Sequence, residues 1–165
     1  MTASSSDAKV RLVDFAETRV AVLEHRGDPT AIGDSIRRFI AWRKTMALPP
    51  RTSATFNILY DDPITAVPEA FRLDHCAATE REVAPNDAGV GVKLIPGGRC
   101  AVLRHVGSDD LLGAALRYLR ADWLPRSGEA SRDFPLYLQR VTFFPDVPEG
   151  EAVTDIFLPL AESAP

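Results

Sequence analysis

An internal duplication constrains the fold of this chain more than any other feature of its sequence. The segment that starts at Arg19 reads RVAVLEHRGDPT, and eighty residues later the segment that starts at Arg99 reads RCAVLRHVGSDD. Aligned without gaps, residues 19–43 and 99–123 share nine identities in twenty-five positions, where average composition gives about two by chance. Such a repeat predicts two copies of one structural unit.

Each copy has the same predicted opening. The β-rich runs at residues 10–15 and 90–95 end at the turn formers AET and PGG, and the strands RVAVLEH and RCAVLRH follow them. Short β-rich runs separated by turn residues are typical of antiparallel pairs, so each half is expected to open with a hairpin.

A helix and a second hairpin complete each predicted copy. Asp28 and Ser108 are candidate helix caps, and apolar residues at helical spacing follow both. The fold expected from this pattern is α+β: two pseudo-twofold-related β-β-α-β-β modules that form a curved antiparallel sheet with two main helices and a central cleft. The expected organisation is a flexible N-terminus at 1–8 and a single domain at 9–165, with module one at 9–80, a connector at 80–89 and module two at 90–161.

Composition excludes several classes of function. The 165 residues carry a formal net charge of −4 and lack a clustered basic surface, which argues against direct binding of nucleic acid. No apolar run is long enough to cross a bilayer, and the N-terminus MTASSSDAKV does not resemble a secretory signal. A cytoplasmic protein without a membrane partner is therefore expected.

The usual catalytic signatures are absent from the sequence: there is no P-loop, HExxH, GxSxG or zinc-spaced cysteine set. His25 and His105 occupy the same position in both copies, which favours a structural role in the turn before each helix. His75 is interpreted as a strand histidine with its hydrogen bonds satisfied. No catalytic residue, metal ligand or cofactor is predicted, and enzymatic activity is left open with a binding function favoured.

The aromatic residues suggest where a ligand could bind. Trp42 and Trp123 end the two predicted helices, one position out of strict register. Core packing and a pocket lining are equally compatible with these two side chains. Pockets lined by aromatic residues with few polar groups often lie between repeated modules.

The strand-His-x-Gly-cap-helix phrase, YDDP at 60–63, VPE in both halves, WLPRSG at 123–128 and TDIFLPL at 154–160 together resemble the GyrI-like, or effector-binding, family. The resemblance covers about residues 9–160 and implies a duplicated SHS2-like fold around a cleft that takes flat, often cationic, drug-like ligands. Relatives occur attached to AraC-type and MerR-type transcription regulators or as free-standing proteins. Some free-standing relatives resemble gyrase-modulating proteins, and others are hydrolases of strained toxins.

The chain departs from the family at one position. Relatives commonly carry a Glu in the first strand of the second module's closing hairpin, and the alignment places Leu138 at that acid and Arg140 at a nearby aromatic. Because burying a cation without a counter-charge costs several kcal/mol, the cleft is expected to prefer neutral or anionic aromatic ligands, with Arg140 as candidate partner. The orientation of Arg140, toward the cleft or toward solvent, is left open.

The leading hypothesis is a free-standing effector-binding or sequestering protein that holds a small amphipathic or aromatic molecule between its modules. The alternatives are a gyrase-modulating interaction domain, with gyrase or a regulator as protein partner, and a hydrolase of reactive small toxins. The expected ligand-binding residues are Asn57, Leu59, Trp123, Leu138, Arg140 and Phe157.

Overall fold

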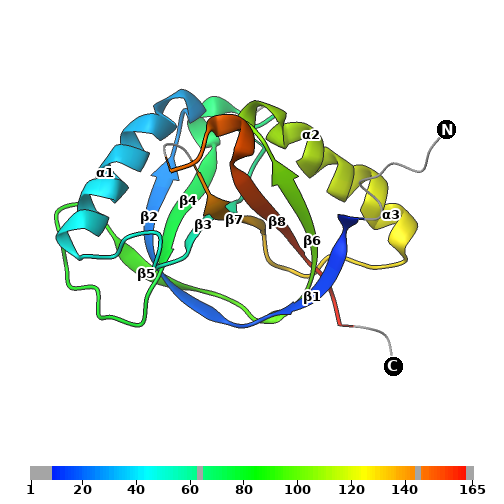
Figure 1. The fold of residues 1–165 in the computed structure, drawn as a ribbon, viewed down its shortest axis with the longest axis horizontal. Coiled ribbons are helices and arrows are strands. Elements are labelled where there is room, and N and C mark those ends of the chain that lie inside the picture. Colours follow the sequence, from blue (N-terminus) through cyan, green and yellow to red (C-terminus); the bar gives the residue numbers. More distant parts are fainter. Residues whose placement is uncertain (1–8, 63–64, 144–145, 163–165) are drawn as a thin grey trace. The chain divides into compact units, whose positions relative to one another are not determined.

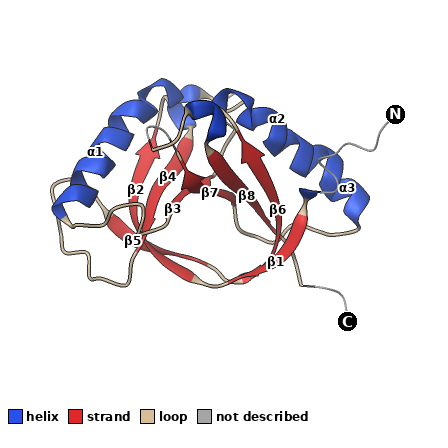
Figure 2. Cartoon of the chain, in the orientation of Figure 1, coloured by secondary structure: helices blue, strands red, loops and turns tan. Residues whose placement is uncertain are grey.

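The structure is a computed structural model that describes residues 9–62, 65–143 and 146–162 (Figure 1). The expected flexible segment 1–8 lies outside these residues. The chain divides into two compact units: unit 2 is Glu17–Pro96, and unit 1 combines the residues up to Ala16 with those from Gly97 onward. Both units contain antiparallel strands and a main helix (Figure 2), so the α+β fold class is confirmed. No helix in the described part of the chain is long and apolar enough to cross a membrane.

Unit 2 is a continuous stretch of chain that forms four antiparallel strands and one long helix. The strand order is β3-β4-β2-β5. The bounds are β2 Thr18–Arg26, α1 Ile32–Thr45, β3 Thr55–Leu59, β4 Arg72–Ala78 and β5 Gly91–Ile95.

Unit 1 has the same architecture but is assembled from two separate stretches of chain. Its strand order is β1-β6-β8-β7. The bounds are β1 Arg11–Phe15, β6 Gly98–Val106, α2 Leu112–Arg117, α3 Leu124–Ser127, β7 Leu136–Thr142 and β8 Val153–Pro159.

The expected opening hairpins are wrong, because the two halves exchange their first strands. β1 pairs with β6, and β5 pairs with β2, both in antiparallel register. Ala16-Glu17 and Pro96-Gly97 are the only residues that separate β1 from β2 and β5 from β6. A two-residue hairpin turn needs a positive φ at its first central residue, which proline cannot adopt and alanine disfavours. The closing hairpins are confirmed, since β3 pairs with β4 and β7 with β8.

The second helix explains the shift in offset between the copies. Between α2 and α3 the chain forms a π-helical turn, Tyr118–Trp123, in which the N–H of Leu124 bonds to the carbonyl of Leu119. A π turn accommodates one extra residue in a helix. Phe39 therefore aligns with Leu119 at an offset of 80, whereas Trp42 aligns with Trp123 at 81.

Helix α1 covers one face of the unit 2 sheet, and the core of this unit lies beneath it. Phe39 and Trp42 from α1 pack with Ala21, Leu23 and Ala77 from the strands in one buried cluster. Trp42 is 7% exposed, so of the two roles left open for it the core role holds. The opposite face of this sheet, which alternate residues of the same strands form, is called the helix-free face below.

Candidate functional site

The helix-free face of unit 2 carries a fully buried acid. Asp74 of β4 is 0% exposed and lies directly opposite Glu24 of β2 in the strand ladder. Like charges placed opposite each other destabilise a sheet. Neighbouring cations must therefore compensate both carboxylates.

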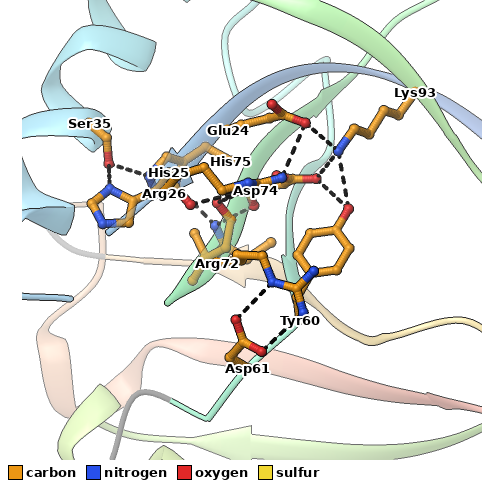
Figure 3. A network of polar contacts seen from close by, with 12 residues as sticks. Glu24, His25, Arg26, Ser35, Tyr60, Asp61, Arg72, Asp74, His75 and Lys93 are labelled. Carbon is orange, nitrogen blue, oxygen red and sulfur yellow. Dashed lines mark hydrogen bonds and ion pairs between the residues drawn. The ribbon is translucent and has the colours of Figure 1, made fainter. Parts of the chain in front are cut away.

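Two cations and one hydroxyl surround the Asp74 carboxylate (Figure 3). Arg26 Nη1 donates to Oδ1 at 3.0 Å, while Lys93 Nζ and the Tyr60 hydroxyl each donate to Oδ2 at 2.7 Å. Glu24 Oε2 accepts from Lys93 at 2.8 Å and from Arg26 at 3.1 Å. The two acids and two bases of this group, called the Asp74 cluster, balance in charge.

The ring of Tyr60 lies among cations of the same face. The guanidinium carbons of Arg26 and Arg72 are each 5.3 Å from the ring centroid, and Lys93 Nζ is 5.4 Å away. Arg72 is in turn held by a two-point ion pair with Asp61 at 3.0 and 3.2 Å. The aromatic surface of Tyr60 is thus already in contact with the chain's own cations.

The protonation of the cluster follows from burial and hydrogen bonding. Burial raises the pKa of Tyr60, and its hydrogen bond to Asp74 raises it further. Burial opposes the charge of Lys93, but the hydrogen bonds to Asp74, Glu24 and Tyr60 outweigh this and raise the pKa of Lys93 above its usual range. Lys93 is therefore an ammonium and Tyr60 a phenol at neutral pH.

A hollow of about 210 Å³ adjoins the Asp74 cluster at the β2–β5 edge of the sheet. It is lined by Val22, Glu24, Gly89, Gly91, Val92 and Lys93. Gly91 lies opposite Val22 in the ladder, and a Cβ added to Gly91 would meet no atom within 4 Å. The missing side chain leaves the hollow open beside Lys93.

A second polar group lies on the helix-covered face of the same unit. Ser35 Oγ is 2.8 Å from His75 Nε2 and 3.0 Å from His25 Nδ1, and Asn57 Nδ2 is 3.2 Å from His75 Nδ1. All four side chains are buried. Asn57 Nδ2 also donates to the carbonyl of Asp74, which fixes the orientation of the amide.

This orientation decides what the second group can do. Because Asn57 donates to Nδ1 of His75, the neutral ring carries its proton on Nε2 and donates it to Ser35. A serine nucleophile needs the reverse, a ring nitrogen that accepts the hydroxyl proton. Ser35 is also only 1% exposed, so the group does not fit the serine-hydrolase arrangement.

The shared histidines have the structural role expected of them. His25 Nε2 is 3.0 Å from the carbonyl of Asp28, and His105 Nε2 is 2.9 Å from the carbonyl of Ser108. Asp28 and Ser108 also cap the following turns through their side chains, as predicted. Each ring therefore closes the turn between strand and helix.

In unit 1 the acid equivalent to Asp74 is neutralised more simply. Asp155 accepts two hydrogen bonds from Arg104, at 2.8 and 3.0 Å, from the directly opposite position of β6. The position of β1 that is equivalent to Lys93 holds Val13, so no lysine takes part in neutralising Asp155. The same fold thus neutralises its buried acid in two different ways.

The residues predicted to line a ligand site do not share one face. In unit 2, Asn57 and Leu59 lie in the helix-covered rows of His75 and His25. In unit 1, Leu138 pairs with Ile156 and is 1% exposed, and Phe157 lies on the other face of the sheet.

Arg140 and Trp123, like Phe157, have protein partners or are partly buried. Arg140 Nη1 donates to Asp109 at 2.7 Å, beside the start of α2, and to Thr154 at 3.3 Å. Trp123 ends the π-helical turn and is partly buried. The ring centroid of Phe157 lies 4.9 Å from that of Tyr137 and 5.3 Å from that of Phe15. A role of these six residues in ligand binding stays a prediction.

Sequence reasoning missed the Asp74 cluster. The alignment of Asp74 with Asp155 and the YDDP phrase that contains Tyr60 were visible signals. A metal role has no support in the described residues, which contain no group of three or more His, Cys, Asp or Glu side chains that could hold an ion.

Comparisons with known proteins agree on the family. The family model for the GyrI-like small molecule binding domain matches residues 8–161. The probable transcriptional regulator YgiV of Escherichia coli K12 is 39% identical over 153 residues, covering 92% of this chain and 96% of YgiV.

Solved structures show the same fold at low identity. The crystal structure of the EcmrR C-terminal domain matches with a TM-score of 0.74 at 18% identity, covering 93% of this chain and 98% of that domain. The structure of SAV2435 bound to tetraphenylphosphonium matches with a TM-score of 0.61 at 9% identity, covering 92% and 93% of the two chains. From the family match and the similarity to YgiV, the chain belongs to the GyrI-like small molecule binding domain family.

Proposed function

We propose that this protein binds a small amphipathic or aromatic molecule as an effector-binding protein, and that it prefers neutral or anionic ligands to cations. Membership of a small-molecule-binding family supports ligand binding in general. The name of the relative YgiV, a probable transcriptional regulator, supports a place in transcriptional control. A gyrase or regulator partner stays a prediction.

The observation that carries the charge preference is the internal neutralisation of the buried acids. A ligand cation that enters a low-dielectric site needs a carboxylate free to compensate it. Asp74 is already paired with Arg26 and Lys93, and Asp155 is paired with Arg104. Neither acid offers an uncompensated negative charge.

The surroundings of Tyr60 support the same preference. Aromatic rings bind cations through their faces, and the Tyr60 ring already lies within 5.4 Å of three protein cations. SAV2435 shares this fold and binds the cation tetraphenylphosphonium. The proposed preference of this chain is therefore opposite in sign to what that relative binds.

For an anionic ligand, Arg140 remains the candidate partner named from the sequence. Its guanidinium now bonds to Asp109, whose side chain is 64% exposed. The Arg140 side chain is 21% exposed, and the more exposed Asp109 carboxylate returns to water when a ligand carboxylate displaces it. Exchange of Asp109 for a ligand carboxylate therefore costs little, and Arg140→Gln should weaken anion binding and leave neutral ligands unaffected.

The test uses phenyl-substituted ligands of similar size and three charge states. Tetraphenylborate, triphenylphosphine oxide and tetraphenylphosphonium are titrated into the protein by calorimetry at constant ionic strength. The expected result is saturable binding of the borate or the oxide, with the phosphonium at least tenfold weaker. Tighter binding of the phosphonium than of both others would refute the charge preference, and no saturable binding of any small aromatic compound would count against the function.

A further inference from the structure

Lys93 occupies an unusual place among the cations of the helix-free face. Its ammonium donates to Asp74 Oδ2 at 2.7 Å, to Glu24 Oε2 at 2.8 Å and to the Tyr60 hydroxyl at 3.2 Å. A lysine ammonium has three N–H groups, so these three acceptors use all of them. The two carboxylates and the hydroxyl form a complete receptor for a primary ammonium group.

The same side chain also forms a wall of the hollow at the β2–β5 edge. Lys93 lines that hollow together with Glu24 and Gly91. Its side chain is 33% exposed, whereas that of its acceptor Asp74 is 0% exposed. Removing the lysine beyond Cβ would therefore extend the hollow toward the Asp74 carboxylate and the Tyr60 hydroxyl.

The duplication shows that the fold does not require this lysine. In unit 1 the equivalent position is Val13, and Asp155 is neutralised by Arg104 across the strand pair. In unit 2 the position opposite Asp74 holds Glu24 instead, a second negative charge. Unit 2 thus presents two acids to one ammonium that reaches them from an edge strand.

We propose that the ammonium of Lys93 occupies a receptor for a primary ammonium group and so determines the specificity of this site by excluding cationic ligands. This inference rests on the proposed function. Without Lys93 the charge of the Asp74 cluster changes from balanced to one net negative charge, because Arg26 remains. The vacated space, from Cγ to Nζ, has the shape of propylammonium. The site would then accept the class of ligand that the wild type refuses.

The experiment is chemical rescue of Lys93→Ala. Propylammonium chloride is titrated into the variant and the wild type, with sodium chloride holding the ionic strength constant, and unfolding is followed by circular dichroism. We expect propylammonium to bind the variant about ten- to one-hundredfold more tightly than the wild type, as charge-assisted hydrogen bonds imply. A ligand that binds only the folded state raises the midpoint of unfolding with its concentration.

Three controls separate this result from general effects of salt or cavity filling. 1-Propanol has the same shape without charge and should not rescue Lys93→Ala. Lys93→Met fills the space without a charge and should not respond to propylammonium. Lys44→Ala removes an exposed lysine in the last turn of α1 and should also be silent.

The outcomes decide the inference independently of the wild-type ligand. Equal rescue by propylammonium and 1-propanol, or equal binding of propylammonium to wild type and variant, overturns it. If Lys93→Ala is unfolded without additive, refolding becomes the readout: recovery with the amine but not the alcohol supports the inference, and recovery with neither overturns it. If the wild type binds none of the aromatic ligands, the proposed function is refuted, and the result of the propylammonium titration can still be interpreted.

Discussion

Replacing Asp74 by asparagine tests the energetic reasoning about the helix-free face most directly. The substitution keeps the size of the side chain and removes the charge that compensates Arg26 and Lys93. Removing one partner of a buried ion pair costs about 3 to 5 kcal/mol. Because the side chains of Arg26 and Lys93 are 39% and 33% exposed and can turn toward water, we expect about 2 to 3 kcal/mol for Asp74→Asn.

Two matched substitutions set the scale. Asp155→Asn affects the equivalent acid, whose partner Arg104 is 50% exposed, and should cost about 1 kcal/mol. Asp34→Asn breaks an exposed pair with Arg37 on α1 and should cost less than about 0.5 kcal/mol. The free energy of unfolding is measured for each by urea denaturation at pH 7 with unchanged m-values as the check on two-state behaviour. An Asp74→Asn cost no larger than that of Asp155→Asn would refute the claim that burial makes this cluster matter.

Three further predictions concern protonation, backbone strain and thiol access. Because the pKa values of Lys93 and Tyr60 are raised in the folded state, the unfolded chain loses these protons first as the pH rises above about 10. The free energy of unfolding should therefore fall with rising pH, and it should fall less steeply in Tyr60→Phe. Urea denaturation at a series of pH values from about 9 to 11.5 measures both slopes. Gly98→Ala should destabilise at least about 1 kcal/mol more than Gly128→Ala, because Gly98 has a φ of 145°, which L-residues strongly disfavour, whereas Gly128 lies in the left-handed helical region with a φ of 78°. Equal losses in urea denaturation would contradict this. Burial raises the pKa of the Cys76 thiol well above its ordinary value, so iodoacetamide should label Cys76 only as fast as the chain opens, and rapid labelling under native conditions would show access that the fold does not provide.

Local signals in the sequence were sufficient for much of the fold. The helix caps Asp28 and Ser108 and the closing hairpins depend on residues close together in the chain, and all are confirmed. The π-helical turn accounts for the one-residue shift that the alignment detected. These features need no knowledge of long-range pairing.

The strand exchange and the Asp74 cluster could not be predicted by the same means. The sequence places residues 90–95 in the second half, which gives no reason to bring Lys93 to Asp74, whereas β5 pairs with β2 of unit 2. The preference between a local hairpin and a distant partner depends on whether two linker residues can adopt a primed turn. Propensity alone does not rank those alternatives.

The interpretation of Leu138 as the replacement of a ligand-facing acid also depends on strand pairing that the sequence alone does not give. Strand register decides which face a residue takes, and a shift of one position reverses it. The observed pairing with Ile156 buries Leu138, while its neighbour Tyr137 pairs with Phe157 on the other face. An argument about ligand charge that starts from one aligned position therefore requires the strand register, because the register decides which residues face the ligand.

The exchange of first strands also has a consequence for the order in which the chain can fold during synthesis. All strands of unit 2 lie within residues 17–96, so the pairs β3–β4, β4–β2 and β2–β5 can form once that stretch has left the ribosome. Strand β1 is made before the strands of unit 2, yet its partner β6 lies about ninety residues later, with Arg11 opposite Val102. Contacts so distant in sequence form slowly and leave strand edges unpaired in the meantime. Strand β1 therefore stays without its partner until residues 98–106 have been made, although it precedes every strand of unit 2 in the chain.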